Sequence, residues 1–316
     1  MFIDTSQDAR FSRVLPGHQL QVNSSSLGPF KTCPRQYYYK IICGWEGQAK
    51  SVHLTFGTLV HEGLAGYEIL RAQGLTHDEA LESTIDWALR KTWNKELKRG
   101  WISGSPEKNR LGLVRTLVWY LDHYADMPGM EVLRLPNGNL AVEIDFEFDS
   151  GWESETTGEH VTFIGKLDRL VKVGNETFVL DTKTTTYQLG LDWFKKFTPD
   201  NQFSLYSMAG GVVLDQPVRG LILDGVQVGA TFSRFERGPV GRSEAFLDEW
   251  LQDSHYWLDY MAKCAEDGYW PMNDRGCGMF GGCEFREICS HNPASRDMWI
   301  KAGFVQKKRG VEEDLL

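Results

Sequence analysis

Three runs of residues with a two-residue period constrain the fold of this 316-residue chain more than any other feature of its sequence. In the run 140–148, apolar Val142, Ile144, Phe146 and Phe148 alternate with acidic residues. The runs 161–173 and 177–183 follow, joined by a short turn at Gly174-Asn175. An apolar residue at every second position is typical of a β-strand with one buried face. The chain is therefore expected to contain a β-sheet in which the last two runs form a hairpin.

Helical patterns lie before and after these strands. Before them we expect four helices: one capped by Ser24–Ser26 and running to about Ile42, one capped by Thr55, one over 76–97 and one over 111–126. After them we expect a helix that starts at Thr198-Pro199-Asp200, with the proline at its first position, strands within 218–232 and a helix over 244–266. This order of elements predicts a mixed α/β (α+β) fold with a central sheet flanked by helices.

No Pro/Gly/Ser-rich linker or internal repeat divides the chain, so we predict a single domain over residues 23–292. It comprises a helical part over about 23–128, a mixed core over about 129–268 and a closing segment over 269–292. Residues 1–22 are expected to form an irregular arm and residues 293–316 a C-terminal tail.

Composition and charge exclude several classes of protein. Hydrophobic residues make up 41% and charged residues 24% of the chain, which excludes wholesale disorder and collagen-like sequences. No apolar run reaches the roughly 18 residues of a membrane span, and the N-terminus shows no secretory signal, so we expect a cytoplasmic protein. The net charge of −9 argues against a protein that coats nucleic acid nonspecifically.

One segment departs from this acidic balance. Residues 90–115 carry eight Lys/Arg against two acids, with Trp93 and Trp101 among them and Trp87 and Trp119 close by. Aromatic rings beside cations suit single-stranded DNA, whose bases stack and whose phosphates meet the positive charge. Packing of these tryptophans in a helical core is the alternative.

Two carboxylates and a lysine are expected to converge at one end of the predicted hairpin. Asp168 lies on one strand, and Asp181 and Lys183 lie on the same face of the next. Carboxylate oxygens suit Mg²⁺ or Mn²⁺, which can polarise a phosphodiester and activate water. In the alternative, Asp181 ends a strand and Lys183 is simply solvated.

Four other polar residues accompany this set. His61 lies off the apolar stripe of its predicted helix, which disfavours a core histidine but leaves a surface histidine possible. Gln202 and Tyr206 are one helical turn apart and share a face. Glu143 lies on the polar side of its strand, where a solvated acid is the alternative.

Several motifs, taken in their order along the chain, resemble a known family. They are Cys33-Pro34-Arg35, Phe56 to His61, Gly165 to Arg169, Asp181 to Thr184 and Gln202 to Tyr206. Together they resemble the RecB-like branch of the PD-(D/E)XK nucleases, which includes CRISPR-associated RecB-like exonucleases, the AddB nuclease domain and phage relatives. The resemblance covers about residues 24–292 and implies a restriction-endonuclease-like core.

The resemblance also implies roles for individual residues. His61, Asp168 and Asp181 would be ligands of Mg²⁺ or Mn²⁺, and Lys183 would be the catalytic lysine. Gln202 and Tyr206 would contact DNA, as would Arg35 of the Cys-Pro-Arg motif. Glu143 matches a weaker acidic position that precedes the aspartate motif.

Six cysteines raise the question of a second metal site. Cys277, Cys283 and Cys289 are spaced six residues apart among glycines, and Cys33 is the candidate for a fourth ligand. Four thiolates suit zinc or an iron–sulfur cluster, and the long spacings favour the cluster. The resemblance implies a [4Fe-4S] cluster that ties the two ends of the nuclease domain together, although the family's first spacing is shorter than that between Cys277 and Cys283. Cys43 and Cys264 are expected to be unligated buried thiols.

These observations predict a metal-dependent DNA exonuclease that acts on single-stranded or end-containing DNA in recombination, repair or DNA processing. A helicase or a recombination or annealing protein would be a separate chain, because no G-x-x-x-x-G-K-[ST] motif is present. Two alternatives stay open. One is a catalytically weak or inactive Fe–S DNA-binding or scaffold module of the same fold, and the other is a zinc-stabilised nucleic-acid binder.

Overall fold

The computed structural model describes residues 5, 8–48, 51–125, 127 and 129–307. The chain divides into two compact units, each built from segments that are distant in the sequence. The first unit comprises residues 1–49, 147–165 and 244–313, and the second comprises 50–146, 166–243 and 314–316. The single domain over 23–292 stays a prediction.

A mixed sheet forms the centre of the second unit. Strand β8 (Glu176–Thr185) pairs antiparallel with β7 (His160–Val173) and parallel with β9 (Gly220–Val228). Strand β10 (Ser233–Gly241) pairs antiparallel with β9, and the short β5 (Met130–Val132) with the end of β7. β6 (Val142–Glu153) also pairs with β7 and, like β7, passes from one unit into the other. The predicted hairpin is confirmed, whereas β10 lies beyond the predicted strand region of 218–232.

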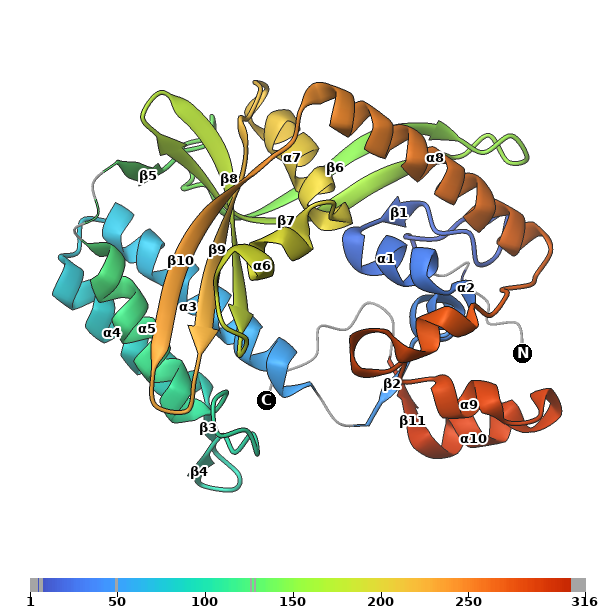
Figure 1. The fold of residues 1–316 in the computed structure, drawn as a ribbon, viewed down its shortest axis with the longest axis horizontal. Coiled ribbons are helices and arrows are strands. Elements are labelled where there is room, and N and C mark those ends of the chain that lie inside the picture. The colour runs from blue at the N-terminus through green and yellow to red at the C-terminus, as the bar shows by residue number, and fades with distance from the viewer. Residues whose placement is uncertain (1–4, 6–7, 49–50, 126, 128, 308–316) are drawn as a thin grey trace. The chain divides into compact units, whose positions relative to one another are not determined.

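Helices cover both faces of this sheet. Helices α3 (Val52–Ala72), α4 (His77–Lys91) and α5 (Arg110–Ala125) lie side by side and share an apolar core with Val226 and Val228 of β9 (Figure 1). On α7 (Asn201–Leu214), Gly210 lies against Val179 of β8 instead. Val179 is paired with Leu221, an odd-numbered position of β9, and so belongs to the face opposite Val226. The predicted mixed α/β fold with a helix-flanked central sheet is therefore confirmed.

The first unit contains the two ends of the described chain. Its elements are β1 (Gln21–Val22), α1 (Ser24–Thr32), α2 (Pro34–Tyr37), the π-helical turn Tyr38–Ile42, β2 (Trp45–Gly47), α8 (Glu244–Glu266), the 3₁₀ segment Asp274–Gly281, α9 (Arg286–Ser290), the 3₁₀ turn Pro293–Ser295, α10 (Arg296–Gly303) and β11 (Phe304–Gln306). β1 runs parallel to the first part of β7, and β11 pairs antiparallel with β2. The predicted arm and tail thus contribute strands, while residues 1–4, 6–7 and 308–316 lie outside the described part of the chain.

The predicted continuous helix from Ser24 to Ile42 is wrong. Cys33 is extended, with φ of −162° and ψ of 110°, and separates α1 from α2. The cause is Pro34, because a residue before proline is disfavoured in the helical region of φ/ψ space. The cap of α1 is Asn23, which forms a capping box with Ser26.

Three other predicted helix boundaries differ from the structure. Helix α3 begins at Val52 with Ser51 as its cap, not Thr55. Helix α4 ends at Lys91 instead of continuing to 97, because β3 (Trp93–Asn94) and β4 (Arg99–Gly100) form a small hairpin there. The cap of α7 is Asp200, so Pro199 lies outside the helix.

Among the described residues, no helix combines the length and the apolar character that a membrane span requires.

Candidate active site

A groove in the second unit brings together α3, β6 and the end of β8. It has a volume of about 470 Å³ and is lined by His53, Leu54, Gly57, Thr58, His61, Lys108, Glu143, Thr182, Lys183 and Thr184. Three of the predicted site residues therefore line one cavity. Asp168 contacts His61 at the same place.

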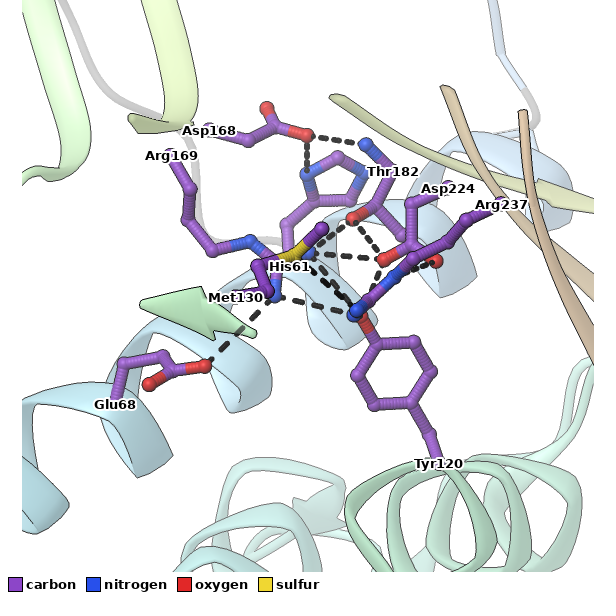
Figure 2. A network of polar contacts seen from close by, with 9 residues as sticks. All are labelled: His61, Glu68, Tyr120, Met130, Asp168, Arg169, Thr182, Asp224 and Arg237. Carbon is purple, nitrogen blue, oxygen red and sulfur yellow. Dashed lines mark hydrogen bonds and ion pairs between the residues drawn. The ribbon is translucent and has the colours of Figure 1, made fainter. Parts of the chain in front are cut away.

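His61, Glu143 and Asp168 form the centre of the site. Their ligand atoms all lie within 4.8 Å of one another. His61 Nδ1 is 3.1 Å from Asp168 Oδ2, and the backbone N–H of Thr182 donates to the same oxygen over 2.8 Å. Figure 2 shows the imidazole and this N–H converging on the Asp168 carboxylate. Three potential metal-ligand side chains, from α3, β6 and β7, therefore lie close together.

The backbone of Glu143 is unusual. Its φ of 47° places a non-glycine residue in the left-handed region, although it lies near the start of a strand. Such a conformation costs about 1–2 kcal/mol in an L-residue and persists only where the surroundings impose it. This conformation accompanies a carboxylate that lies beside His61 and Asp168.

Asp181 and Lys183 form an adjacent ion pair. Both side chains lie on the same face of β8, as the strand period predicts, and Lys183 Nζ is 2.6 Å from Asp181 Oδ2. Asp181 is completely buried, and no donor from the described residues hydrogen-bonds its Oδ1. Asp181 is not a member of the group formed by His61, Glu143 and Asp168, so its role as a metal ligand stays a prediction. We call His61, Glu143, Asp168, Asp181 and Lys183 the groove cluster.

Burial and the charges of neighbouring side chains shift the pKa values in the groove cluster. Burial, together with the neighbouring Asp168, raises the pKa of both Asp181 and Glu143. Burial also acts to raise the pKa of Asp168, but His61, Lys183 and the Thr182 N–H overcome it and lower that pKa. Burial acts to lower the pKa of His61, but the charge of Asp168 outweighs it and raises that pKa. Three carboxylates therefore lie beside one imidazole. These groups can be ligands of a hard divalent cation, whose positive charge would stabilise the ionised carboxylates.

Gln202 and Tyr206 also lie near this cluster. The amide of Gln202 donates to the hydroxyl of Tyr206 over 2.9 Å, one turn along α7. Burial, with the charge of Asp181, raises the pKa of Tyr206 to about 12. The predicted pair is thus formed, and its tyrosine lies within electrostatic reach of the groove cluster.

A second group of charged side chains, which sequence reasoning missed, occupies the opposite face of β8. Asp224 accepts hydrogen bonds from Arg169, Arg237, Tyr120 and Thr182, and Glu68 lies 3.9 Å from Arg169. Figure 2 shows Arg169, Arg237 and Tyr120 converging on Asp224, with Glu68 reaching Arg169 from α3. We call Glu68, Tyr120, Arg169, Asp224 and Arg237 the buried network. The only sequence signal for it was the strand period, which turns Arg169 and Thr182 away from Asp168 and Asp181.

Of the four tryptophans in and beside the basic segment 90–115, two pack in the helical core and two are exposed. Trp87 and Trp101 pack against the helical core, whereas Trp93 and Trp119 are 46% and 44% exposed. The guanidinium of Arg110 lies 5.7 Å from the centre of the Trp93 ring. The small hairpin therefore presents an exposed aromatic ring beside a cation.

The four predicted cluster cysteines all belong to the first unit. Burial raises the pKa of Cys283, with contributions from Cys277 and Cys33, and burial raises the pKa of Cys289, with contributions from Cys283 and Cys33. The backbone N–H of Asn273 donates to Cys33 Sγ over 3.3 Å. Cys283 thus interacts electrostatically with Cys277 and Cys33, and Cys289 with Cys283 and Cys33. Four thiolates are the ligand type of an iron–sulfur cluster, and the cluster itself stays a prediction.

The segment that carries these cysteines approaches the N-terminal helices closely. A Cβ added to Gly276 would lie 3.1 Å from the carbonyl oxygen of Thr32, a tighter contact than most Cβ atoms make, so a larger residue there would have to displace its neighbour. Arg35 donates from Nε to the carbonyl oxygen of Trp270 over 2.7 Å and lies 5.8 Å from the centre of the Tyr269 ring. Its predicted contact with DNA stays a prediction.

The helix-flanked mixed sheet with a carboxylate–lysine set at one strand end defines a class of metal-dependent nucleases. In agreement, the family model of the PD-(D/E)XK nuclease superfamily matches residues 21–290. The chain belongs to this superfamily.

Other comparisons are weaker. The crystal structure of a proposed exonuclease from Eubacterium rectale is 12% identical, with 86% of this chain and 90% of that chain covered and a TM-score of 0.48. The crystal structure of SSO0001 is 12% identical, with 86% and 87% covered and a TM-score of 0.34. No curated protein sequence matches the chain. The family assignment therefore rests on the family model.

Proposed function

We propose that this protein is a Mg²⁺- or Mn²⁺-dependent DNA exonuclease of the RecB-like branch. The observation that carries the proposal is the convergence of His61, Glu143 and Asp168 within 4.8 Å beside the Asp181–Lys183 pair. Asp181 would complete the ligand set, because its buried carboxylate has a raised pKa and an oxygen without a hydrogen-bond donor in the described structure.

We propose different tasks for the metal ion, for His61 and Asp168, and for Lys183 in this reaction. A bound divalent cation would polarise the scissile phosphodiester and lower the pKa of an attacking water. His61 and the Thr182 N–H orient the Asp168 carboxylate, and Lys183 supplies positive charge where negative charge develops on the phosphate. Gln202 and Tyr206 would contact the DNA strand beside it.

Single-stranded or end-containing DNA is the substrate we propose. The exposed Trp93 ring beside Arg110 supports this choice, since an aromatic ring stacks on any unpaired base and the guanidinium can meet its phosphate. The setting we propose is recombination, repair or DNA processing, with a separate helicase or annealing protein as partner.

Digestion of end-labelled DNA tests this proposal. Linear single-stranded and duplex DNA should be degraded in Mg²⁺ or Mn²⁺ and remain intact in EDTA, whereas closed circular DNA should persist. Asp168→Ala should abolish degradation and weaken Mn²⁺ binding in calorimetry, and the exposed Lys172→Ala should do neither. If the wild-type protein binds Mn²⁺ but cuts no DNA, the alternative of a catalytically inactive binding or scaffold module of the same fold is favoured.

We further propose that Cys33, Cys277, Cys283 and Cys289 hold one [4Fe-4S] cluster with a structural role. Support comes from the mutual effects of these thiols on their pKa values and from the Asn273 N–H directed at Cys33 Sγ. Such a link would close a loop of roughly 250 residues and restrict the unfolded chain.

Iron and sulfide analysis of anaerobically purified protein tests the cluster. Cys33→Ser should lower iron content, visible absorbance and melting temperature together. Cys43→Ser, which changes a buried thiol outside the proposed set, is the matched control and should preserve all three. Stoichiometric zinc without iron, or full iron content in Cys33→Ser, would refute the cluster.

A further inference from the structure

A lysine with no assigned role lies in the groove beside the groove cluster. Lys108 is only 2% exposed and lines the same cavity as His61, Glu143 and Lys183. Its Nζ lies 3.2 Å from Thr184 Oγ1 and 3.4 Å from the Thr184 carbonyl oxygen, the residue directly after Lys183 on β8. The centre of the Phe56 ring lies 5.7 Å from the same nitrogen.

This ammonium has neutral partners only. In the described part of the chain, no carboxylate oxygen lies within 4.0 Å of Lys108 Nζ, and burial alone lowers the pKa of Lys108 to about 8. Lysine is almost never buried without a partner, because the loss of hydration of an ammonium is expensive. The ammonium of Lys108 has three N–H donors, and its two contacts to Thr184 use only part of this hydrogen-bonding capacity.

Lys183, which lines the same groove, has a carboxylate partner, unlike Lys108. Lys183 is held by Asp181 at 2.6 Å, so its charge is already balanced by the carboxylates of the groove cluster. The charge of Lys108 is not balanced, although both side chains line the same groove. The groove therefore combines a carboxylate-rich centre suited to a cation with one uncommitted cation suited to an anion.

We propose that Lys108 binds a backbone phosphate of the DNA strand next to the scissile phosphate. The identity of the ligand as DNA rests on the proposed function, whereas the need for an anionic partner rests on the burial and the contacts of Lys108 alone. A nucleic-acid strand supplies successive phosphates, so one can occupy the cleavage centre while its neighbour meets Lys108. This contact would fix the register of the strand, and Thr184 would orient the ammonium.

Salt-dependent binding of a labelled single-stranded oligonucleotide tests the proposal. Binding is measured by fluorescence anisotropy in Ca²⁺ at several salt concentrations, with strand integrity checked on gels. Lys108→Met should lower the affinity about tenfold, as expected for one charge-assisted hydrogen bond. It should also reduce the slope of log K against log salt by about 0.7, the value for one phosphate contact to a single strand. Lys108→Arg should retain most of the slope, and the exposed Lys172→Met should change neither quantity.

Two further measurements distinguish an internal phosphate contact from a terminal one and from a loss of folding. Oligonucleotides with and without terminal phosphates should show the same loss in Lys108→Met, because the proposed contact is to an internal phosphodiester. A loss seen only with a terminal phosphate would overturn that assignment. The melting temperature of Lys108→Met should be unchanged or higher, because an uncompensated buried charge is removed. If that variant fails to fold, Lys108→Gln is measured in its place.

The outcomes separate this inference from the proposed function. An unchanged salt slope in folded Lys108→Met would overturn the inference, even where the wild-type protein degrades DNA. Lys108 would then have a structural role only, through its hydrogen bonds to Thr184 of β8. A reduced slope would sustain the inference even where the wild-type protein degrades nothing. Failure of the wild-type protein to bind the strand would overturn it directly.

Discussion

The two faces of β8 carry charged clusters that differ in how their charge is balanced. In the buried network, the fully buried Asp224 receives donors on both oxygens from Arg169, Arg237 and Tyr120. In the groove cluster, the equally buried Asp181 has Lys183 as its ion-pair partner and one oxygen that no described donor reaches. The network pairs two acids with two arginines, whereas the groove cluster sets three acids against one lysine and one histidine.

This difference distinguishes a structural cluster from a functional one. Polar groups whose partners are all present hold their surroundings in one arrangement, and they leave nothing for a ligand to satisfy. Carboxylates with raised pKa values, such as Asp181 and Glu143, are stabilised when a cation arrives. Thr182 connects the two clusters, because its N–H donates to Asp168 while its hydroxyl contacts Arg169 and Asp224.

The largest expected effect concerns the network. Asp224→Ala should reduce the free energy of unfolding by about 3–5 kcal/mol, because the buried Arg169 and the partly buried Arg237 each lose a carboxylate partner. Asp181→Ala is the matched variant in the groove cluster and should leave stability nearly unchanged, since Lys183 is partly exposed. Chemical denaturation of both variants measures the contrast, and equal losses would show that the two clusters do not differ in kind.

The rate of DNA degradation should depend on the groove cluster. Lys183→Ala should lower the rate of DNA degradation by about 10²–10³-fold, as expected when one electrostatic stabiliser of a transition state is lost. The purified variant should remain folded. Single-turnover digestion provides the measurement, with Lys172→Ala as the control for an unrelated lysine. Wild-type rates in the purified variant would remove Lys183 from the proposed mechanism.

Metal addition should act on the groove cluster alone. Mn²⁺ at about 100 times its dissociation constant should stabilise the wild-type protein by about 2.7 kcal/mol through mass action. The increment should vanish in Asp168→Ala and persist in Glu68→Gln, which alters only the buried network. Thermal melts with and without Mn²⁺ measure it. An increment that survives in Asp168→Ala would place the bound ion elsewhere.

The smallest effect is a pH dependence within the network. Burial raises the pKa of Glu68 although three arginines act to lower it. The folded state therefore holds this proton more tightly than the unfolded state, and ionisation of Glu68 disfavours folding at neutral pH. Glu68→Gln should be more stable than the wild-type protein by less than about 1 kcal/mol at pH 7, and this advantage should shrink as the pH falls through the raised pKa. Denaturation curves from pH 7 to pH 4.5 measure the trend, and an advantage that grows toward low pH would contradict it.

Local rules in the sequence predicted a large part of the fold. The strand period identified β7 and β8 and assigned Asp181 and Lys183 to a shared face. The errors also had local causes, since Pro34 forces Cys33 out of the helical region and Ser51 caps α3 ahead of Thr55. The left-handed backbone of Glu143 had no such signal, because nothing in its sequence neighbourhood favours that conformation.

What the sequence determined by itself was the direction of side chains along each element. Alternation on a strand and the 3.6-residue period of a helix are properties of the backbone, so they follow from the order of residues alone. Which elements meet was decided only by the tertiary structure. The contact between Lys108 and Thr184 spans 76 residues and that between Tyr120 and Asp224 spans 104. Such contacts depend on how helices pack on the sheet, which no local period encodes, and they distinguish the buried network from the groove cluster.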